Sequence, residues 1–142
     1  TRSDLVTGVQ TCALPICTIL ENITLGNNAI SLPELQQICT VVGLQDFVNK
    51  QQLGLHTHID TQGKKLSYNI SQKILLARCI SARPALLLIE DCWIGIEPLI
   101  RQQVINYLTH PSNPFTMVAV TNDDYFLSKC SHTYVMKNGS LA

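Results

Sequence analysis

The stretch from residue 65 to residue 91 constrains the fold of this chain more than any other part of the sequence. The Arg83-Pro84 dipeptide divides it into two segments of different character. In the first segment, apolar residues recur at roughly helical spacing, which predicts a helix beginning at Leu66. The second segment, residues 85–89, is a continuous apolar run without alternation, which is typical of a strand buried on both faces.

Two acidic residues, Glu90 and Asp91, follow this apolar run. Open α/β sheets bind their ligands at the carboxyl ends of their strands, so the two carboxylates lie at a candidate ligand site. A second apolar run, residues 115–121, predicts another buried strand, which ends at Asn122. These features indicate an α/β fold with Glu90 and Asp91 as its first candidate functional residues.

Length and composition exclude several classes of protein. A chain of 142 residues forms at most one ordinary domain. The formal net charge is zero and charged residues make up 14% of the sequence, which argues against nucleic acid or an anionic membrane surface as the partner. The sequence has no run of eighteen consecutive apolar residues, so we expect no segment to span a membrane.

Cysteine and histidine are the two residue types that raise the question of a metal site. The six cysteines form no CxxC pair, so we expect reduced, buried cytosolic thiols, with disulfides or bound metal as the alternatives. His56 and His58 lie in a polar stretch, residues 54–63, that predicts a loop. No cysteine or acidic cluster accompanies them, so we expect solvated histidines and no metal site, with a metal site as the alternative.

Residues 1–17 do not join smoothly to the rest of the sequence. Residues 6–16 can be back-translated into DNA that closely resembles a common short-read sequencing adapter, so we interpret 1–17 as a non-native leader. Such a leader is expected to lack stable packing against the rest of the chain. The alternative is a signal peptide or native leader, but Asp4 lies where a signal peptide is basic, and threonine and proline interrupt the short apolar stretch.

Local signals predict the remaining elements. Ser31 and Glu34 have the spacing of a capping box, with Pro33 in the first turn of a helix over about 32–42 that Gly43 ends. Further predicted elements are a short helix over 44–49, a helix from Glu97-Pro98 to near His110, a helix over 124–129 capped by Asp123, and a C-terminal hairpin at Asn138-Gly139 preceded by a strand from His132.

The segment 65–91 resembles the signature helix and Walker B strand of the ATP-binding cassette (ABC) family. There the sequence LSGGQ is followed by a basic helix start, a proline, four aliphatic residues and Asp-Glu. Here Leu66-Ser67 match, Tyr68-Asn69-Ile70 replace Gly-Gly-Gln, Gln72-Lys73 follow, and the two acids are inverted to Glu90-Asp91. Residues 18–26, TILENITLG, are similar to a segment of export-type cassettes, T-I-x-E-N-I-x-x-G.

The resemblance covers residues 18–142 and corresponds to the second half of a cassette. It implies a partial P-loop NTPase core of the α/β class with an inserted helical subdomain at about 20–82 and the core half at about 83–142. The glycine-rich phosphate loop, G-x-x-x-x-G-K-S/T, is absent from the sequence. Since that loop holds the phosphates in P-loop proteins, this chain has no nucleotide grip of its own.

The resemblance also implies a role for each candidate site residue. The signature residues contact the phosphate of a nucleotide bound to the opposite subunit, and here they are Leu66, Ser67, Tyr68, Asn69, Ile70 and Gln72. Glu90 takes the position that binds Mg²⁺, and Asp91 takes that of the acid that polarises the attacking water. Glu97 stands for the D-loop acid and Asn122 for the switch histidine. The alternative is structural: a plain helix start, and two acids that merely end a strand.

The implied function is the ATPase domain of an ABC-type exporter, which couples ATP binding and hydrolysis to transport across the membrane. ATP and Mg²⁺ are the implied cofactors, and the implied partners are the transmembrane domain of the same transporter and a second nucleotide-binding domain, with no nucleic acid. The implied location is the cytoplasmic face of the membrane. Because four motifs depart from the family pattern, we expect this copy to be impaired in hydrolysis.

Two rival functions follow from the same motifs. One is a non-catalytic cassette that binds nucleotide to clamp or regulate a partner domain. The other is a soluble cassette acting in DNA or ribosome biology, against which the TILENITLG segment and the neutral charge both argue. The transported substrate is not encoded in these motifs, since the membrane helices select it.

Overall fold

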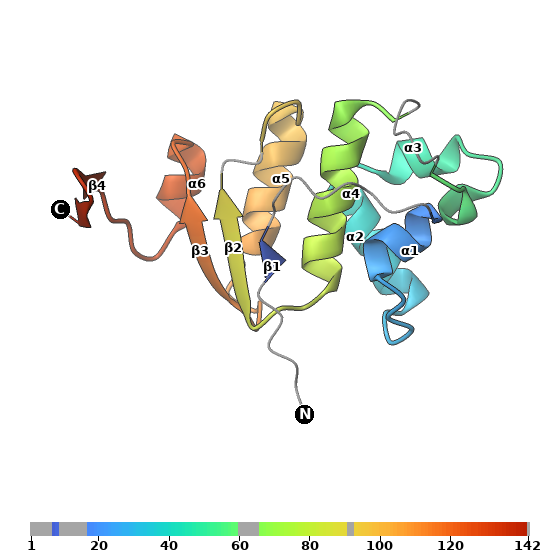
Figure 1. The fold of residues 1–142 in the computed structure, drawn as a ribbon, viewed down its shortest axis with the longest axis horizontal. Coiled ribbons are helices and arrows are strands. Elements are labelled where there is room, and N and C mark those ends of the chain that lie inside the picture. Colours follow the sequence, from blue (N-terminus) through green and yellow to red (C-terminus); the bar gives the residue numbers. More distant parts are fainter. Residues whose placement is uncertain (1–6, 9–16, 60–65, 91–92, 142) are drawn as a thin grey trace.

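A computed structural model describes residues 7–8, 17–59, 66–90 and 93–141 of the chain (Figure 1). A parallel sheet with the strand order β1-β2-β3 lies at its centre. Its strands are β1 (Thr7–Gly8), β2 (Leu86–Glu90) and β3 (Thr116–Val120). The predicted α/β class is confirmed at this level, because α5 (Pro98–Leu108) connects two neighbouring parallel strands. Asp91 and most of the 1–17 segment lie outside the described residues.

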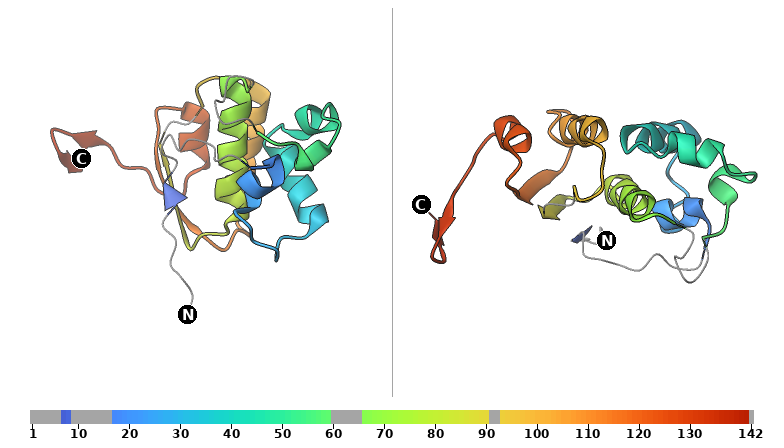
Figure 2. Two further views of the ribbon diagram at one scale, coloured as in Figure 1. Left: turned by 45° about the vertical axis from the view of Figure 1, so that its right-hand side comes forward. Right: turned by 90° about the horizontal axis from the view of Figure 1, so that it is seen from above.

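The described helices form two groups. The first comprises α4 (Tyr68–Ser81), α5 and α6 (Asp124–Lys129), which all lie on one face of the sheet (Figure 2). The second group lies beyond α4 from the sheet and comprises α1 (Ile19–Thr24), α2 (Leu32–Val41), α3 (Gln45–Asn49) and the short 3₁₀ helix η1 (Gly54–His56). This second group falls within the range predicted for a helical subdomain. In the described ranges, no helix has the length and apolar character needed to cross a membrane.

Among the described residues, β2 is buried on one face and β3 is half-buried on one face, so the prediction that each strand is buried on both faces is wrong for the described structure. In β2, Leu87 and Ile89 are buried against the helices, whereas Leu88 is half-buried. In β3, Val118 and Val120 are 53% and 66% exposed on the other face. The physical reason is that the described helices that pack on the sheet, α4, α5 and α6, all lie on the same side of it.

Residues Thr7 and Gly8 pair in parallel with Leu87 and Leu88 of β2. This pairing differs from the expectation that the leader makes no stable contact with the rest of the chain. An unpaired strand edge presents a row of amide and carbonyl groups that an extended segment can bind, whatever its side chains. The pairing of Thr7 and Gly8 uses backbone groups only, so it does not require a native sequence at these positions. The interpretation of residues 1–17 as a non-native leader remains a prediction.

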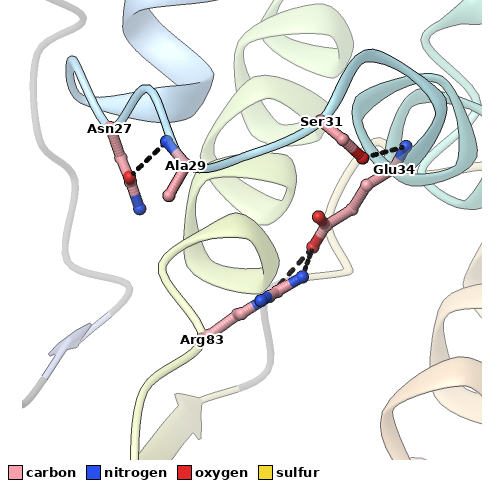
Figure 3. Close-up of polar contacts among 5 residues, drawn as sticks. All are labelled: Asn27, Ala29, Ser31, Glu34 and Arg83. Atoms are coloured by element: carbon pink, nitrogen blue, oxygen red, sulfur yellow. Dashed lines mark hydrogen bonds and ion pairs between the residues drawn. The ribbon is translucent and has the colours of Figure 1, made fainter.

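Helix caps explain where α1 and α2 begin. At α1, Thr18 and Glu21 form a full capping box, in which the Thr18 amide donates to the Glu21 carboxylate at 2.8 Å. At α2, Ser31 Oγ accepts the Glu34 amide at 3.4 Å. The Glu34 carboxylate, however, points toward Arg83 (Figure 3), so only the serine half of the predicted capping box forms in this described segment.

The C-terminal hairpin has the predicted turn. Strands β4 (Met136–Lys137) and β5 (Ser140–Leu141) are antiparallel, and Asn138 and Gly139 both adopt positive φ, at 50° and 80°. Asn-Gly is the pair that a two-residue type I′ turn favours, because both central residues need positive φ. The hairpin lies apart from the parallel sheet (Figure 1), and the residues from His132 to β4 are irregular instead of extending the strand as predicted.

Candidate functional site

Glu90 and Asn122 lie at the same edge of the sheet. Glu90 and Val120 are direct partners in the register of β2 and β3, and Asn122 follows two residues after Val120. Both side chains are exposed. Figure 1 shows that α4, α5 and α6 begin at this same end of the molecule. The structure therefore brings two of the predicted site residues to the edge where α/β sheets bind ligands.

The six residues of the signature segment divide by burial. Ser67 and Tyr68 are exposed, and Asn69 is half-buried beside them. By contrast, Leu66 and Ile70 pack against the core, and Gln72 is buried. Only the first group can meet a ligand directly.

Ser67 caps the N-terminus of α4. Its hydroxyl accepts the amide of Ile70 at 3.3 Å, and its carbonyl accepts the Ser71 hydroxyl at 3.3 Å. These bonds place the serine hydroxyl at a helix N-terminus, where the amides and the helix dipole favour negative charge. The predicted position of this serine at a helix start is confirmed; a contact with phosphate stays a prediction.

The loop after the two acids is a tight turn that joins β2 to α5. Trp93 and Ile96 are buried, and the Ile96 amide donates to the Trp93 carbonyl at 3.0 Å. The Trp93 ring meets Phe126 of α6 edge-on, with 5.8 Å between the ring centroids. Gly95 adopts a φ of +78°, which L-residues rarely occupy. The loop is therefore anchored in the core by its apolar residues and turned by its glycine.

The N-terminal half of α4 contacts this loop through polar side chains. The Lys73 ammonium lies 2.8 Å from Glu97 Oε2, and Lys73 is buried although Glu97 is not. The Asn69 side-chain amide donates to the carbonyl of Gly95. The hydrogen bond from Lys73, with those from the backbone and Asn69, holds the pKa of the Glu97 carboxyl below its ordinary value. The predicted D-loop acid thus has a defined partner within the chain.

The residues flanking Asn122 are fixed by their own hydrogen bonds. Asp123 caps α6 as predicted, accepting the Phe126 amide at 2.9 Å, and its other oxygen lies 3.1 Å from Arg101 Nη1. The Thr121 hydroxyl accepts the Asp123 amide at 3.0 Å. The position of Asn122 is therefore held from both sides.

Sequence reasoning gave no functional or positioning role to Lys73 or Arg101. Lys73 is four residues after Asn69, so the two lie on one face of the predicted helix. That spacing is the sequence signal that could have identified Lys73 as a neighbour of the site. Arg101 is four residues after Glu97, at the start of the same helix.

One described site residue has the chemistry of a magnesium ligand. Glu90 presents an exposed carboxylate at a strand end, and carboxylate oxygens are ligands that Mg²⁺ takes in proteins. Across 17–59, 66–90 and 93–141, no three or more histidine, cysteine, aspartate or glutamate residues gather in a way that could hold a metal ion. His58 instead pairs through its backbone with Thr18 in an isolated β-bridge.

Comparison with curated proteins relates the chain to exporters. It is 25% identical over 124 residues to an export ATP-binding/permease protein of Rickettsia typhi, covering 87% of this chain and 22% of the relative. It is 28% identical over 127 residues to the alpha-factor-transporting ATPase of Saccharomyces cerevisiae, covering 87% of this chain and 10% of the relative. The chain thus spans about a fifth of the length of the first relative and about a tenth of the length of the second. No family model matches it.

Comparison with solved structures shows a shared fold. A bacterial Atm1-family ABC exporter with ATP bound superposes on the chain with a TM-score of 0.78 at 22% sequence identity. The match covers 94% of this chain and 24% of the exporter chain, so the two share a fold over nearly the whole of the present sequence. The homologues of this chain are ABC exporter ATP-binding/permease proteins, and the resemblance predicted from residues 18–142 is confirmed.

Proposed function

We propose that this chain is the C-terminal part of the ATP-binding domain of an ABC-type exporter, and that this copy hydrolyses ATP poorly. The observation that supports the proposal most directly is the register of β2 and β3, which places Glu90 beside Val120 and brings Asn122 to the same sheet edge. The exporter homologues support the same assignment. The proposed location is the cytoplasmic face of the membrane.

In this proposal each exposed group has one task. Glu90 holds a hydrated Mg²⁺, and Asp91, which lies outside the described residues, orients the attacking water. Asn122 donates a hydrogen bond to phosphate. When bound, ATP and Mg²⁺ supply the phosphoryl group and its charge neutralisation, while the phosphate loop that grips them belongs to sequence not present in this chain. Ser67 and the start of α4 face a nucleotide held by a second nucleotide-binding domain.

The inverted acids and the asparagine account for the proposed impairment. Exchanging the positions of Asp and Glu moves each carboxylate by about one methylene, and misplacement by about 1 Å can reduce a rate by about a hundredfold. Asn122 cannot carry the positive charge that an imidazole can. The partners in this proposal are the transmembrane domain of the same transporter and the second nucleotide-binding domain.

The test is made on the longer protein that carries this segment together with a phosphate loop. The triple variant E90D/D91E/N122H is expected to raise ATP turnover by about ten- to a thousandfold, because it restores base geometry and imidazole chemistry. A matched control is D46E/N49H on α3, which makes the same types of change at two exposed positions away from the site. ATP binding and turnover are measured for the original protein and both variants.

The outcomes separate the alternatives. Brisk turnover in the original protein that falls in the triple variant would show that the inverted acids are a working arrangement. Retained ATP binding without turnover in any variant would favour the non-catalytic cassette, which the same three departures also support. Equal responses of the triple variant and the α3 control would remove Glu90 and Asn122 from the site.

A further inference from the structure

We propose that Tyr68, Asn69 and Lys73 of α4 form an intramolecular latch that holds Gly95 and Glu97 of the loop between β2 and α5. These five residues are called the latch below. Two of them, Tyr68 and Asn69, replace the paired glycines of the ABC signature. In this proposal, the two residues that depart from the family pattern hold the loop between β2 and α5.

Spacing along the two elements makes the latch possible. Asn69 and Lys73 are four residues apart and so lie on one face of α4. Gly95 and Glu97 are two residues apart in the loop, with the buried side chain of Ile96 between them. Asn69 donates to the Gly95 carbonyl, and Lys73 lies 2.8 Å from a Glu97 oxygen. Two polar residues one helical turn apart are thus matched to two alternate positions of the loop.

Tyr68 completes the latch by packing on the glycine. A Cβ placed on Gly95 would lie 3.3 Å from Tyr68 Cδ1, a separation tighter than an ordinary van der Waals contact. The aromatic ring therefore lies directly against the glycine, which is also the residue that needs positive φ for the turn. Neither contact exists with glycine at positions 68 and 69, because glycine has no side chain to supply the ring or the amide donor.

The latch has a direct consequence for α5. Glu97 is the N-cap residue of that helix and Pro98 follows it, so holding Glu97 also fixes the point at which α5 begins. Trp93 and Ile96 anchor the same loop by burial, and the latch adds polar contacts to that anchor. The latch acts within one chain and is tested without nucleotide, so it stands or falls independently of the proposed function.

Amide hydrogen exchange in the full chain tests the latch. The Ile96 amide, which donates to the Trp93 carbonyl, reports opening of the loop. Asn69→Ala removes the donor while introducing a better helix former, so α4 itself is not weakened. Exchange at Ile96 is expected to accelerate by about fivefold, the change made by one net hydrogen bond of average strength. Y68A/N69A is expected to accelerate it further.

Two internal references make the result decisive. Ser71→Ala on the same helix removes a hydroxyl bond to the Ser67 carbonyl and leaves the five latch residues in place, so it is expected to leave the Ile96 exchange unchanged. The Leu35 amide in α2, bonded to the Ser31 carbonyl at 3.0 Å, reports the rest of the fold. Unchanged exchange at Ile96 in Asn69→Ala, or an equal acceleration at Leu35, would overturn the latch.

Discussion

At the scale of single residues, Lys73 and Glu97 form an ion pair whose two partners differ in burial. Its side chain is only 6% exposed, whereas that of its partner Glu97 is 53% exposed. Removing one partner therefore leaves the other in a different environment in each case. An unpaired Glu97 remains solvated, but an unpaired Lys73 remains buried, and a buried charge without a partner is costly.

This asymmetry predicts that Glu97→Gln destabilises the protein more than Lys73→Met. Glu97→Gln keeps an oxygen that can accept from Lys73 but removes the countercharge of the buried ammonium, so it is expected to lower the free energy of unfolding by about 1–3 kcal/mol. Lys73→Met keeps the apolar stem of the side chain and removes the charge, so it is expected to cost less. Pulse proteolysis in urea at pH 7 measures both. Equal losses would contradict the burial difference.

The same pair predicts a dependence on pH. Because the folded pKa of Glu97 is lowered from 4.5, its contribution to stability is present above about pH 4.5 and is lost as the pH falls through the folded pKa. Lys73→Met removes the first cause of that lowering. The decline in stability below pH 4.5 is therefore expected to be shallower in Lys73→Met than in the original chain, and an unchanged slope would exclude the pair as its source.

The residue scale also shows what sequence can and cannot predict. Glu90 was identified because it follows an apolar run, and Asn122 because it takes the place of the family's switch histidine. The register of β2 and β3 brings both to one edge. The contact of Lys73 with Glu97 was not identified, because it joins residues 24 positions apart through a tertiary approach. Among the described cysteines, Cys39 and Cys79 are buried as predicted, and burial raises the pKa of the Cys39 thiol to about 11, whereas Cys17 and Cys130 are half-buried.

At the scale of elements, two arginines tie the helical group to the α4–β2 segment in different ways. Arg78 Nε donates to the Asn22 carbonyl at 2.7 Å, and Arg78 Nη2 donates to the Asn22 side chain at 2.9 Å. This contact joins α4 to α1 at a site where Asn22 is fully buried. Arg83, by contrast, is largely exposed and pairs with Glu34 of α2.

These environments predict that Arg78→Met is more damaging than Arg83→Met. Loss of the Arg78 bonds leaves the Asn22 carbonyl and side chain without these donors in a buried site, so the free energy of unfolding is expected to fall by about 2–4 kcal/mol. The exposed pair of Arg83 contributes at most about 1 kcal/mol, as surface ion pairs do. Pulse proteolysis of the two variants gives the comparison, and a larger loss for Arg83→Met would contradict it.

Element boundaries were predictable where the local chemistry decides them. Asp123 begins α6, Gly43 follows α2, and Asn138-Gly139 makes the hairpin turn, because each depends on a cap or on positive φ. The capping box at Ser31 failed because Glu34 has a competing cationic partner, Arg83, that is distant in sequence. Local patterns predict which bonds a residue can make, but tertiary neighbours decide which one forms.

At the scale of the whole molecule, the sheet has one covered face and one bare face among the described residues. The continuous apolar runs of β2 and β3 predicted cover on both faces, because their pattern carries apolar residues on each side. The apolar pattern of a strand does not predict which segment of a protein packs against each of its faces. The relatives are several-fold longer than this chain, and the described helices cover only one side (Figure 2).

The bare face predicts that the chain expressed alone associates or binds hydrophobic dyes. Val118 and Val120 are exposed on this face of the edge strand β3. Contiguous apolar surface on an edge strand is a template for association. Residues 18–142 alone are therefore expected to elute as oligomers in size-exclusion chromatography and to enhance the fluorescence of an anilinonaphthalene dye.

Two matched double variants test whether the exposed face of the sheet causes this association. V118T/V120T keeps the β-branched shape that suits a strand and makes the bare face polar. L53T/L99T makes a comparable polar change at two exposed leucines outside the sheet, 65% and 76% exposed. We expect V118T/V120T to shift the chain toward monomer and reduce dye binding, and L53T/L99T to leave both unchanged. A monomeric original chain with a sharp cooperative melt would show that the bare face needs no cover, since the helices on the other face then suffice to stabilise the sheet.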